Sequence, residues 1–170
     1  MMIRILGGIL ICASCGLLGL YMGYRGVVRA RHLAEFKQSL LLLKSEIEFA
    51  AYALPQAFAN VSQRAGDSLA DFYMSLSRRV EEKISLDDAW NVGLKELKNN
   101  HLAKEDLQVV CNLGKSLGSI DSEVQIKAID MAIIAIDDIL ARVNDQNAKE
   151  GKMYRRLGIL GGVLITVVLL

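Results

Sequence analysis

Apolar residues run without interruption through the first part of the chain. The stretch Ile5 to Tyr24 contains no charged side chain. Because a helix rises about 1.5 Å per residue, about 20 apolar residues cross a hydrocarbon layer of about 30 Å. Several arginines follow this stretch closely, whereas only Arg4 precedes it. The pattern predicts a transmembrane helix over residues 1–24, and the excess of arginine after it places residues 25–156 in the cytoplasm.

Two later segments, 32–50 and 121–145, carry apolar residues at alternating spacings of three and four. This is the period of a helix packed lengthwise against another helix. The first seam consists of Leu33, Phe36, Leu40, Leu43, Ile47 and Ala50, and Leu41 and Leu42 widen its apolar face. The second consists of Ile126, Ile129, Ile133, Ile136, Leu140 and Val143. Since the seams match in length and period, we expect the two long helices to pack antiparallel.

Four shorter helices are predicted between these seams. The first begins at Pro55, because proline suits the first turn of a helix. The next follows the break at residues 66–68, the third is capped by Ser85, and the fourth covers about residues 104–117. The only tryptophan, Trp90, is expected to be an internal anchor. The expected core residues are Phe36, Leu40, Leu43, Ile47, Trp90, Ile129, Ile133, Ile136 and Leu140.

The last residues, 157–170, are again apolar and follow a cluster of basic residues with Tyr154. This segment is short for a full span, and we expect a second transmembrane or membrane-embedded helix there. Small residues on the two membrane segments would let the helices approach closely. The predicted packing positions are Cys15, Gly19, Gly23, Gly158, Gly161 and Gly162.

Composition agrees with this organisation. The 170 residues are 52% hydrophobic and include one proline. We therefore predict an all-α fold, an antiparallel bundle of about six helices flanked by N- and C-terminal transmembrane helices. The body of the bundle, His32 to Ala148, has 12 basic and 18 acidic residues, a net charge of −6. Such a body is a poor binder of polyanions, so nucleic acid is not an expected partner.

Carboxylates recur at heptad spacing on the last long helix. They are Glu123, Asp130 and Asp137, reinforced by Asp138. One hypothesis is that this stripe binds a basic surface of a partner protein. The alternative is a solvated face in which Lys127 pairs with Glu123 four residues away.

Groups for catalysis are sparse. The two histidines, His32 and His101, have no triad or metal-ligand partner at a meaningful spacing. Gly114-Lys115-Ser116 resembles the end of a phosphate-binding loop, but it lacks the earlier glycine and the preceding strand of that motif. We therefore expect no enzyme activity and no catalytic, cofactor or metal site, and no small-molecule substrate.

Several motifs together resemble the stage III sporulation protein AB family, and the likeness covers nearly the whole chain. The most specific pieces are Ser45-Glu46-Ile47, Leu54-Pro55-Gln56-Ala57, Ser85-Leu86-Asp87-Asp88-Ala89-Trp90 and Leu113-Gly114-Lys115-Ser116-Leu117-Gly118. That family in turn is similar to the cytoplasmic helical-bundle domains of the inner-membrane platform proteins of type II secretion and type IV pilus machines. This chain differs from them in having Gly114-Lys115 where they usually have Gly-Glu, and one bundle where they have two.

The resemblance implies a role in endospore formation. The chain would be a platform or adaptor subunit of the complex that links mother cell and forespore, and it would lie in the mother-cell membrane around the forespore. Its bundle would face the mother-cell cytoplasm and bind the stage III sporulation ATPase (AA-type), a secretion-type ATPase, and neighbouring membrane subunits. Homo-oligomerisation stays open, as does an alternative function: a membrane-linked sensor or regulator that transmits a signal through a two-state bundle.

Overall fold

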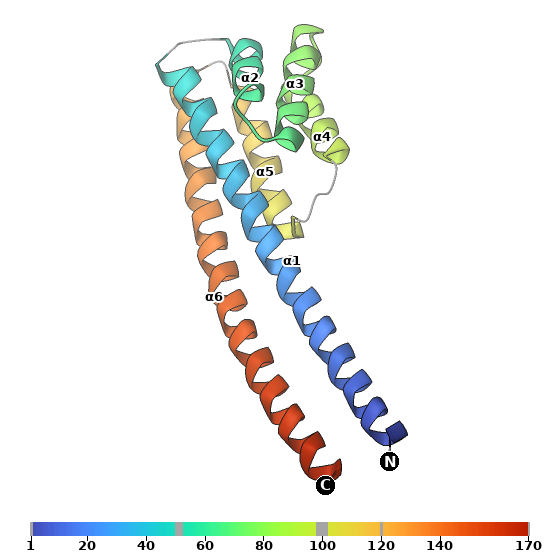
Figure 1. Cartoon of the computed structure of the whole chain (residues 1–170). Helices are drawn as coiled ribbons and strands as arrows, with labels where there is room; N and C mark the ends of the chain where they lie inside the picture. The colour runs from blue at the N-terminus through green and yellow to red at the C-terminus, as the bar shows by residue number, and fades with distance from the viewer. Residues whose placement is uncertain (1, 50–52, 98–101, 120, 170) are drawn as a thin grey trace. The chain divides into compact units, whose positions relative to one another are not determined.

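The computed structural model describes the backbone of residues 2–49, 53–97, 102–119 and 121–169 and the side chains of residues 25–49, 53–67, 69–97, 102–119, 121–149 and 153. Over these residues the chain forms six α-helices and no strand (Figure 1). The helices are α1 (Met2–Glu48), α2 (Leu54–Ser62), α3 (Asp67–Glu81), α4 (Leu86–Glu96), α5 (Lys104–Leu117) and α6 (Ser122–Leu169). The predicted all-α bundle is therefore confirmed.

The chain divides into two compact parts. One is Arg31–Leu140, which contains α2 to α5 together with the adjoining lengths of α1 and α6. The other joins Met1–Ala30 to Ala141–Leu170. The first part contains most of the described side chains and is the helical bundle considered below.

The membrane helices predicted from the sequence fall at the ends of α1 and α6. Among the described residues, no helix combines the length and the apolar character that crossing a membrane requires. The side chains of the two predicted spans, 1–24 and 157–170, lie outside those that the structure describes. The predicted packing positions lie outside them too: Cys15, Gly19, Gly23, Gly158, Gly161 and Gly162. The transmembrane helices therefore stay a prediction.

Most residues of the two apolar seams are buried in the core of the bundle. In α1, Leu33, Phe36, Leu40, Leu43 and Ile47 are all at most 5% exposed. In α6, Ile129, Ile133 and Ile136 are at most 9% exposed, whereas Ile126 is half-buried. Ala50 of the first seam lies outside the described residues. Leu140, which we expected to be buried, is only half-buried, and Ile139 is buried instead. Gln125, Ala132 and Ile139, which recur every seven residues, are all buried, so the core face of α6 includes the position just before Leu140 in the heptad.

Two ion pairs show that α1 and α6 run antiparallel within the bundle. Lys37 Nζ lies 2.6 Å from Asp137 Oδ1, and Lys44 Nζ lies 2.8 Å from Asp130 Oδ1. Going forward by seven residues in α1 therefore means going back by seven residues in α6. The antiparallel packing expected from the matched seams is confirmed for this part of the chain.

The short helices begin where local chemistry favours it. Pro55 occupies the first turn of α2, where its missing N–H leaves no bond unmade. At the start of α4 the Ser85 side chain accepts a hydrogen bond from the backbone N–H of Asp88, at 3.2 Å. At the start of α5 the Asp106 carboxylate accepts a bond from the backbone N–H of Ala103, at 2.7 Å. These bonds satisfy N–H groups that the first turn of a helix leaves without partners.

Aromatic side chains from α1 to α4 meet at the centre of the bundle. Phe72 is at the middle of the cluster, 5.2 Å from both Tyr73 and Trp90 by ring centroids, with its ring nearly perpendicular to each. Phe58 of α2 lies within 6.3 Å of Tyr73 and Trp90, and Phe36 of α1 lies 6.5 Å from Phe72, between ring centroids. Edge-to-face contacts of this kind add about 0.5–1.5 kcal/mol per pair beyond burial. The cluster ties four helices to one another.

Candidate partner-binding surface

The four carboxylates that the sequence singled out do not act as one group. Asp130 and Asp137 are bound to lysines of α1, with both carboxylate oxygens of each within 2.9 Å of a lysine Nζ. The side chains of Lys37 and Lys44 are 30% and 27% exposed, so these pairs lie at the edge of the helix contact. A basic partner would have to compete with lysines that already hold these two carboxylates.

The electrostatics of the Lys44 pair follow from this contact. The hydrogen bond to Asp130 raises the pKa of Lys44, and the attraction to Asp130 and Glu48 acts in the same direction. Desolvation opposes the rise, because it disfavours the charged ammonium. Lys44 therefore stays charged through the neutral range and favours the observed register of the two helices.

The other two carboxylates point to solvent. Glu123 lies 3.9 Å from Lys127, and both side chains are more than three-quarters exposed. Asp138 is exposed and forms no ion pair within the part of the chain that the structure describes. The acidic stripe thus consists of two paired and two solvent-facing groups. Binding of a partner protein by this stripe stays a prediction.

Sequence reasoning missed the lysines that complete this edge of the bundle. Lys37 and Lys44 are seven residues apart in α1, and Asp130 and Asp137 are seven apart in α6. Once two helices are expected to run antiparallel, opposite charges at matching heptad spacing indicate which residues pair. That signal was available in the sequence.

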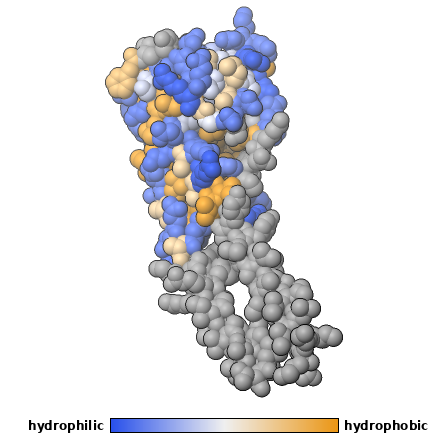
Figure 2. Space-filling model, viewed as in Figure 1, coloured by the Kyte–Doolittle hydropathy of each residue, from blue (hydrophilic) through white to orange (hydrophobic). Residues whose placement is uncertain are grey.

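Apolar side chains on the outer faces of the two long helices were also missed. Leu41 was expected to widen the apolar face of its helix, and in the structure it is 41% exposed. Its position between Lys37 and Lys44 places it at the α1–α6 edge rather than in the core. On α6, Met131 and Ile134 are 73% and 63% exposed. Separate apolar patches are visible among the polar residues of the bundle surface (Figure 2).

The motif around Gly114 has a packing role in α5. Gly114 is buried, and a Cβ added there would overlap the indole ring of Trp90 and lie 2.9 Å from its Nε1. The same nitrogen donates a hydrogen bond to the backbone oxygen of Val110, at 2.9 Å. The glycine thus lets the tryptophan of α4 lie directly on the backbone of α5. The helical context that argued against a phosphate-binding loop is confirmed.

A second motif residue, Glu46, ties α1 to α2. Its side chain is 9% exposed, and its oxygens accept hydrogen bonds from Asn60 at 2.7 Å and from Arg64 at 3.3 Å. A carboxylate with so little contact with water needs such partners, because an unpaired buried charge is strongly destabilising. The position of Glu46 next to Ile47 of the apolar seam therefore fixes how α2 lies on α1.

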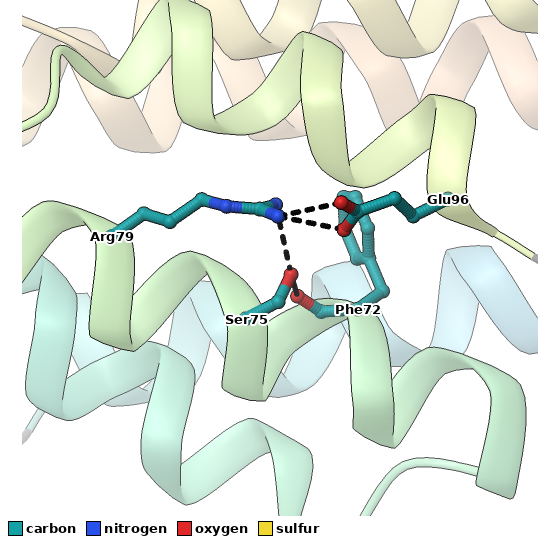
Figure 3. A network of polar contacts seen from close by, with 4 residues as sticks. All are labelled: Phe72, Ser75, Arg79 and Glu96. Carbon is teal, nitrogen blue, oxygen red and sulfur yellow. Dashed lines mark hydrogen bonds and ion pairs between the residues drawn. The ribbon is translucent and has the colours of Figure 1, made fainter.

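A polar network links α3 to α4 (Figure 3). The Arg79 guanidinium donates to both oxygens of Glu96, each at 2.7 Å. It also reaches the Ser75 hydroxyl at 3.4 Å, and that hydroxyl donates to the backbone oxygen of Phe72 at 2.9 Å. The two bonds to Glu96 come from Nη2 and the bond to Ser75 comes from Nη1, so both terminal nitrogens of the arginine are held. The network lies on the outer side of the aromatic cluster and holds α4 against α3.

One buried titratable group lies inside the cluster. The Ser39 hydroxyl donates to the backbone oxygen of Phe36 at 2.7 Å, so the Tyr73 hydroxyl, 2.9 Å away, donates to Ser39. Burial raises the pKa of Tyr73 well above its usual range, and the hydrogen bond to Ser39 opposes only part of that rise. The phenol is therefore neutral in the folded protein. It joins α1 to α3 and takes no part in a surface site.

No group of histidine, cysteine, aspartate and glutamate side chains among the described residues has an arrangement suited to a metal ion. His101 lies outside those residues, and His32 is half-buried in α1. The contacts described above join the helices through packing, hydrogen bonds and ion pairs.

Comparisons with known proteins agree with these motifs. The profile of the family described as stage III sporulation protein AB matches residues 4–170. The stage III sporulation protein AB of Bacillus subtilis (strain 168) is 25% identical over 171 residues, which cover 99% of this chain and all of that protein. A solved structure of a stage III sporulation protein AB (SpoIIIAB) shares the fold with a TM-score of 0.64 and 21% identity, over 71% of this chain and 97% of that one.

Proposed function

This chain belongs to the stage III sporulation protein AB family and so has a role in sporulation, and we propose that it acts there as a membrane-anchored, non-catalytic adaptor. Its bundle binds a secretion-type ATPase and neighbouring membrane subunits of the complex between mother cell and forespore. The bundle faces the mother-cell cytoplasm. The partners come from the resemblance to platform proteins, and the arrangement of the helices supports the anchoring.

The observation that carries the proposal is the antiparallel pairing of α1 and α6. Because Lys37 pairs with Asp137 and Lys44 with Asp130, Arg31 and Leu140 leave the bundle at the same end. The chain beyond each of these residues reaches an apolar stretch flanked by basic side chains. A bundle whose two connections leave at one end suits a protein held to a membrane through both termini, with its short helices presented to soluble partners.

The experiment is a crosslinked pull-down of the full-length chain from membranes of sporulating cells. An epitope follows Lys104, which is exposed at the start of α5. We expect recovery of the ATPase together with membrane subunits, identified by mass spectrometry. Recovery of neither, from cells in which the tagged chain supports spore formation, would contradict the proposal. Recovery of the chain from the soluble fraction alone would contradict the anchoring.

A further inference from the structure

Helix α6 carries a second heptad seam on the face opposite its buried one. Its members are Val124, Lys127, Met131, Ile134 and Asp138, at spacings of three, four, three and four. Of the inner seam, Ile129, Ile133, Ile136 and Val143 are buried, whereas every member of this outer seam is exposed. A single exposed apolar residue is ordinary, but apolar residues at helical packing positions are the pattern of a surface that receives another helix.

The neighbouring helix extends this surface. Ile134 lies between Asp130 and Asp137 along α6, as Leu41 lies between Lys44 and Lys37 along α1. Because those acids and lysines are paired, Leu41 and Ile134 lie at the same level of the two helices. The ion pairs hold the two backbones in register on either side of the apolar residues. The surface is therefore held in place by the bundle before any partner arrives.

The charges of the outer seam indicate the chemistry of the partner. Lys127 lies one helical turn before Met131, and Asp138 lies one turn after Ile134. The side chain of Lys127 is 76% exposed, and its contact with Glu123 is long, at 3.9 Å. A complementary helix would place a carboxylate opposite Lys127, a basic group opposite Asp138, and apolar side chains between them.

A second copy of this chain does not fit that pattern. Two copies anchored in one membrane with the same topology would bring their α6 helices together in parallel. Across a two-fold axis each seam residue would then face its own counterpart. Lys127 would meet Lys127 and Asp138 would meet Asp138, and like charges at these positions disfavour pairing.

We propose that the outer seam of α6 is the docking site for an amphipathic helix of another protein. Two apolar side chains of that helix cover Met131 and Ile134, an acidic side chain pairs with Lys127, and a basic side chain pairs with Asp138. The inference rests on the proposed adaptor function, for which it names the surface and the chemistry of one partner. The paired carboxylates Asp130 and Asp137 serve the α1–α6 contact and take no part.

The test is photo-crosslinking in membranes of sporulating cells. Benzoylphenylalanine replaces Met131 in the full-length chain, and the crosslinked peptide is sequenced by mass spectrometry. The expected peptide comes from one other protein. It has apolar residues at spacings of three and four between an acidic and a basic residue about eleven positions apart, the separation of Lys127 and Asp138. The matched control places the same probe at Gln108, which is exposed on α5, and should give about a tenth of the yield.

A charge exchange sharpens the result. Asp138→Lys should lower the yield at position 131 about tenfold, and reversing the basic residue of the partner should restore it. An unchanged yield, a crosslink to a second copy, a peptide without the pattern, or equal capture at Gln108 would overturn the proposal. Trp90 fluorescence shows that each variant is folded. If the pull-down still recovers the ATPase while position 131 captures nothing, only this inference fails; if both fail, the proposed function fails too.

Discussion

The α3–α5 region and the α1–α6 pair are held together in different ways. In the first, Trp90 lies on the bare backbone at Gly114, and Phe72 lies 3.0 Å from where a Cβ of Gly93 would be. In the second, aliphatic side chains repeat along two long helices, and ion pairs close the edge. The first contact depends on the shapes of a few residues, whereas the second depends on a repeated spacing.

The difference explains where the family motifs lie. A large ring packed on a glycine tolerates few alternatives at either position, because protein interiors are close-packed. An aliphatic layer tolerates leucine, isoleucine or methionine with modest cost. The most specific sequence pieces therefore include both partners of the Trp90–Gly114 contact, whereas the two seams, apart from Ser45-Glu46-Ile47, are recognisable by their period.

The largest expected effect concerns the α1–α6 seam. Ile136 is 1% exposed, so Ile136→Ala should lower the free energy of unfolding by about 2–5 kcal/mol through lost burial and the cavity that remains. The measurement is denaturant unfolding of the detergent-solubilised full-length chain, followed by Trp90 fluorescence. Ile134→Ala is the matched control on the same helix; with 63% exposure it should change stability by less than about 0.5 kcal/mol. Equal effects would show that the two faces of α6 are wrongly assigned.

The next effect concerns the region around Trp90. Gly114→Ala places a methyl group 2.4 Å from two atoms of the indole ring, so the helices must separate or the ring must turn, at a cost of about 1–3 kcal/mol. Gly118→Ala is the control, because the nearest atom to its Cβ is a backbone oxygen at an ordinary 3.6 Å. A shifted emission maximum in the folded Gly114→Ala protein would locate the change at Trp90. If Gly114→Ala were as stable as the original protein, the close packing of Trp90 on Gly114 would be contradicted.

Alkaline pH gives a third, smaller effect. Burial raises the pKa of Tyr73, whereas the unfolded chain releases this proton near pH 10. Above pH 10 the unfolded state binds fewer protons than the folded state, so stability falls with rising pH, by at most about 1.4 kcal/mol per pH unit for this group. Tyr73→Phe should flatten the stability curve above pH 10. Lys44 also loses its stabilising charge as pH rises through its raised pKa. This loss is the same in the original protein and in Tyr73→Phe, so it cancels in the difference between their stability curves. Parallel curves would contradict the assignment.

The smallest effect concerns the edge of the α1–α6 pair. Lys37 and Asp137 are part-exposed, so a double-mutant cycle with Lys37→Gln and Asp137→Asn should give a coupling of about 0.2–1 kcal/mol that declines with added salt. Exchanging the two charges, Lys37→Asp with Asp137→Lys, should recover most of the stability that either single exchange removes. A coupling of zero would show that the Lys37–Asp137 pair does not stabilise the register of α1 and α6, which would then depend on the aliphatic seams.

The sequence predicts most of the helices because their signals are local. Pro55, Ser85 and the two seams mark helix starts and buried faces, and α5 was predicted with the bounds that it has. Leu140 was assigned to the core wrongly, because the buried face of α6 includes Ile139, one position earlier. Leu41 does widen the apolar face of its helix, but it is exposed beside the charged edge that Lys37 and Lys44 form with α6.

The candidate site was harder to predict because its residues come from two distant segments. The carboxylates Asp130 and Asp137 looked available until the lysines of α1 were placed beside them. The outer seam of α6 was overlooked because the stronger inner seam accounted for the helix. The packing role of Gly114 could not be seen from its own motif, since the indole that needs it lies in another helix.

The contact between Trp90 and Gly114 also has an evolutionary consequence. Because the indole lies against the backbone at 114, a larger residue there should cost less in a lineage that has already lost the tryptophan. A restored tryptophan should likewise cost less where the glycine is already present, so we expect substitutions at the two sites to favour one order. A sporulating lineage that keeps one residue without the other would carry a cavity or a clash at the centre of its bundle.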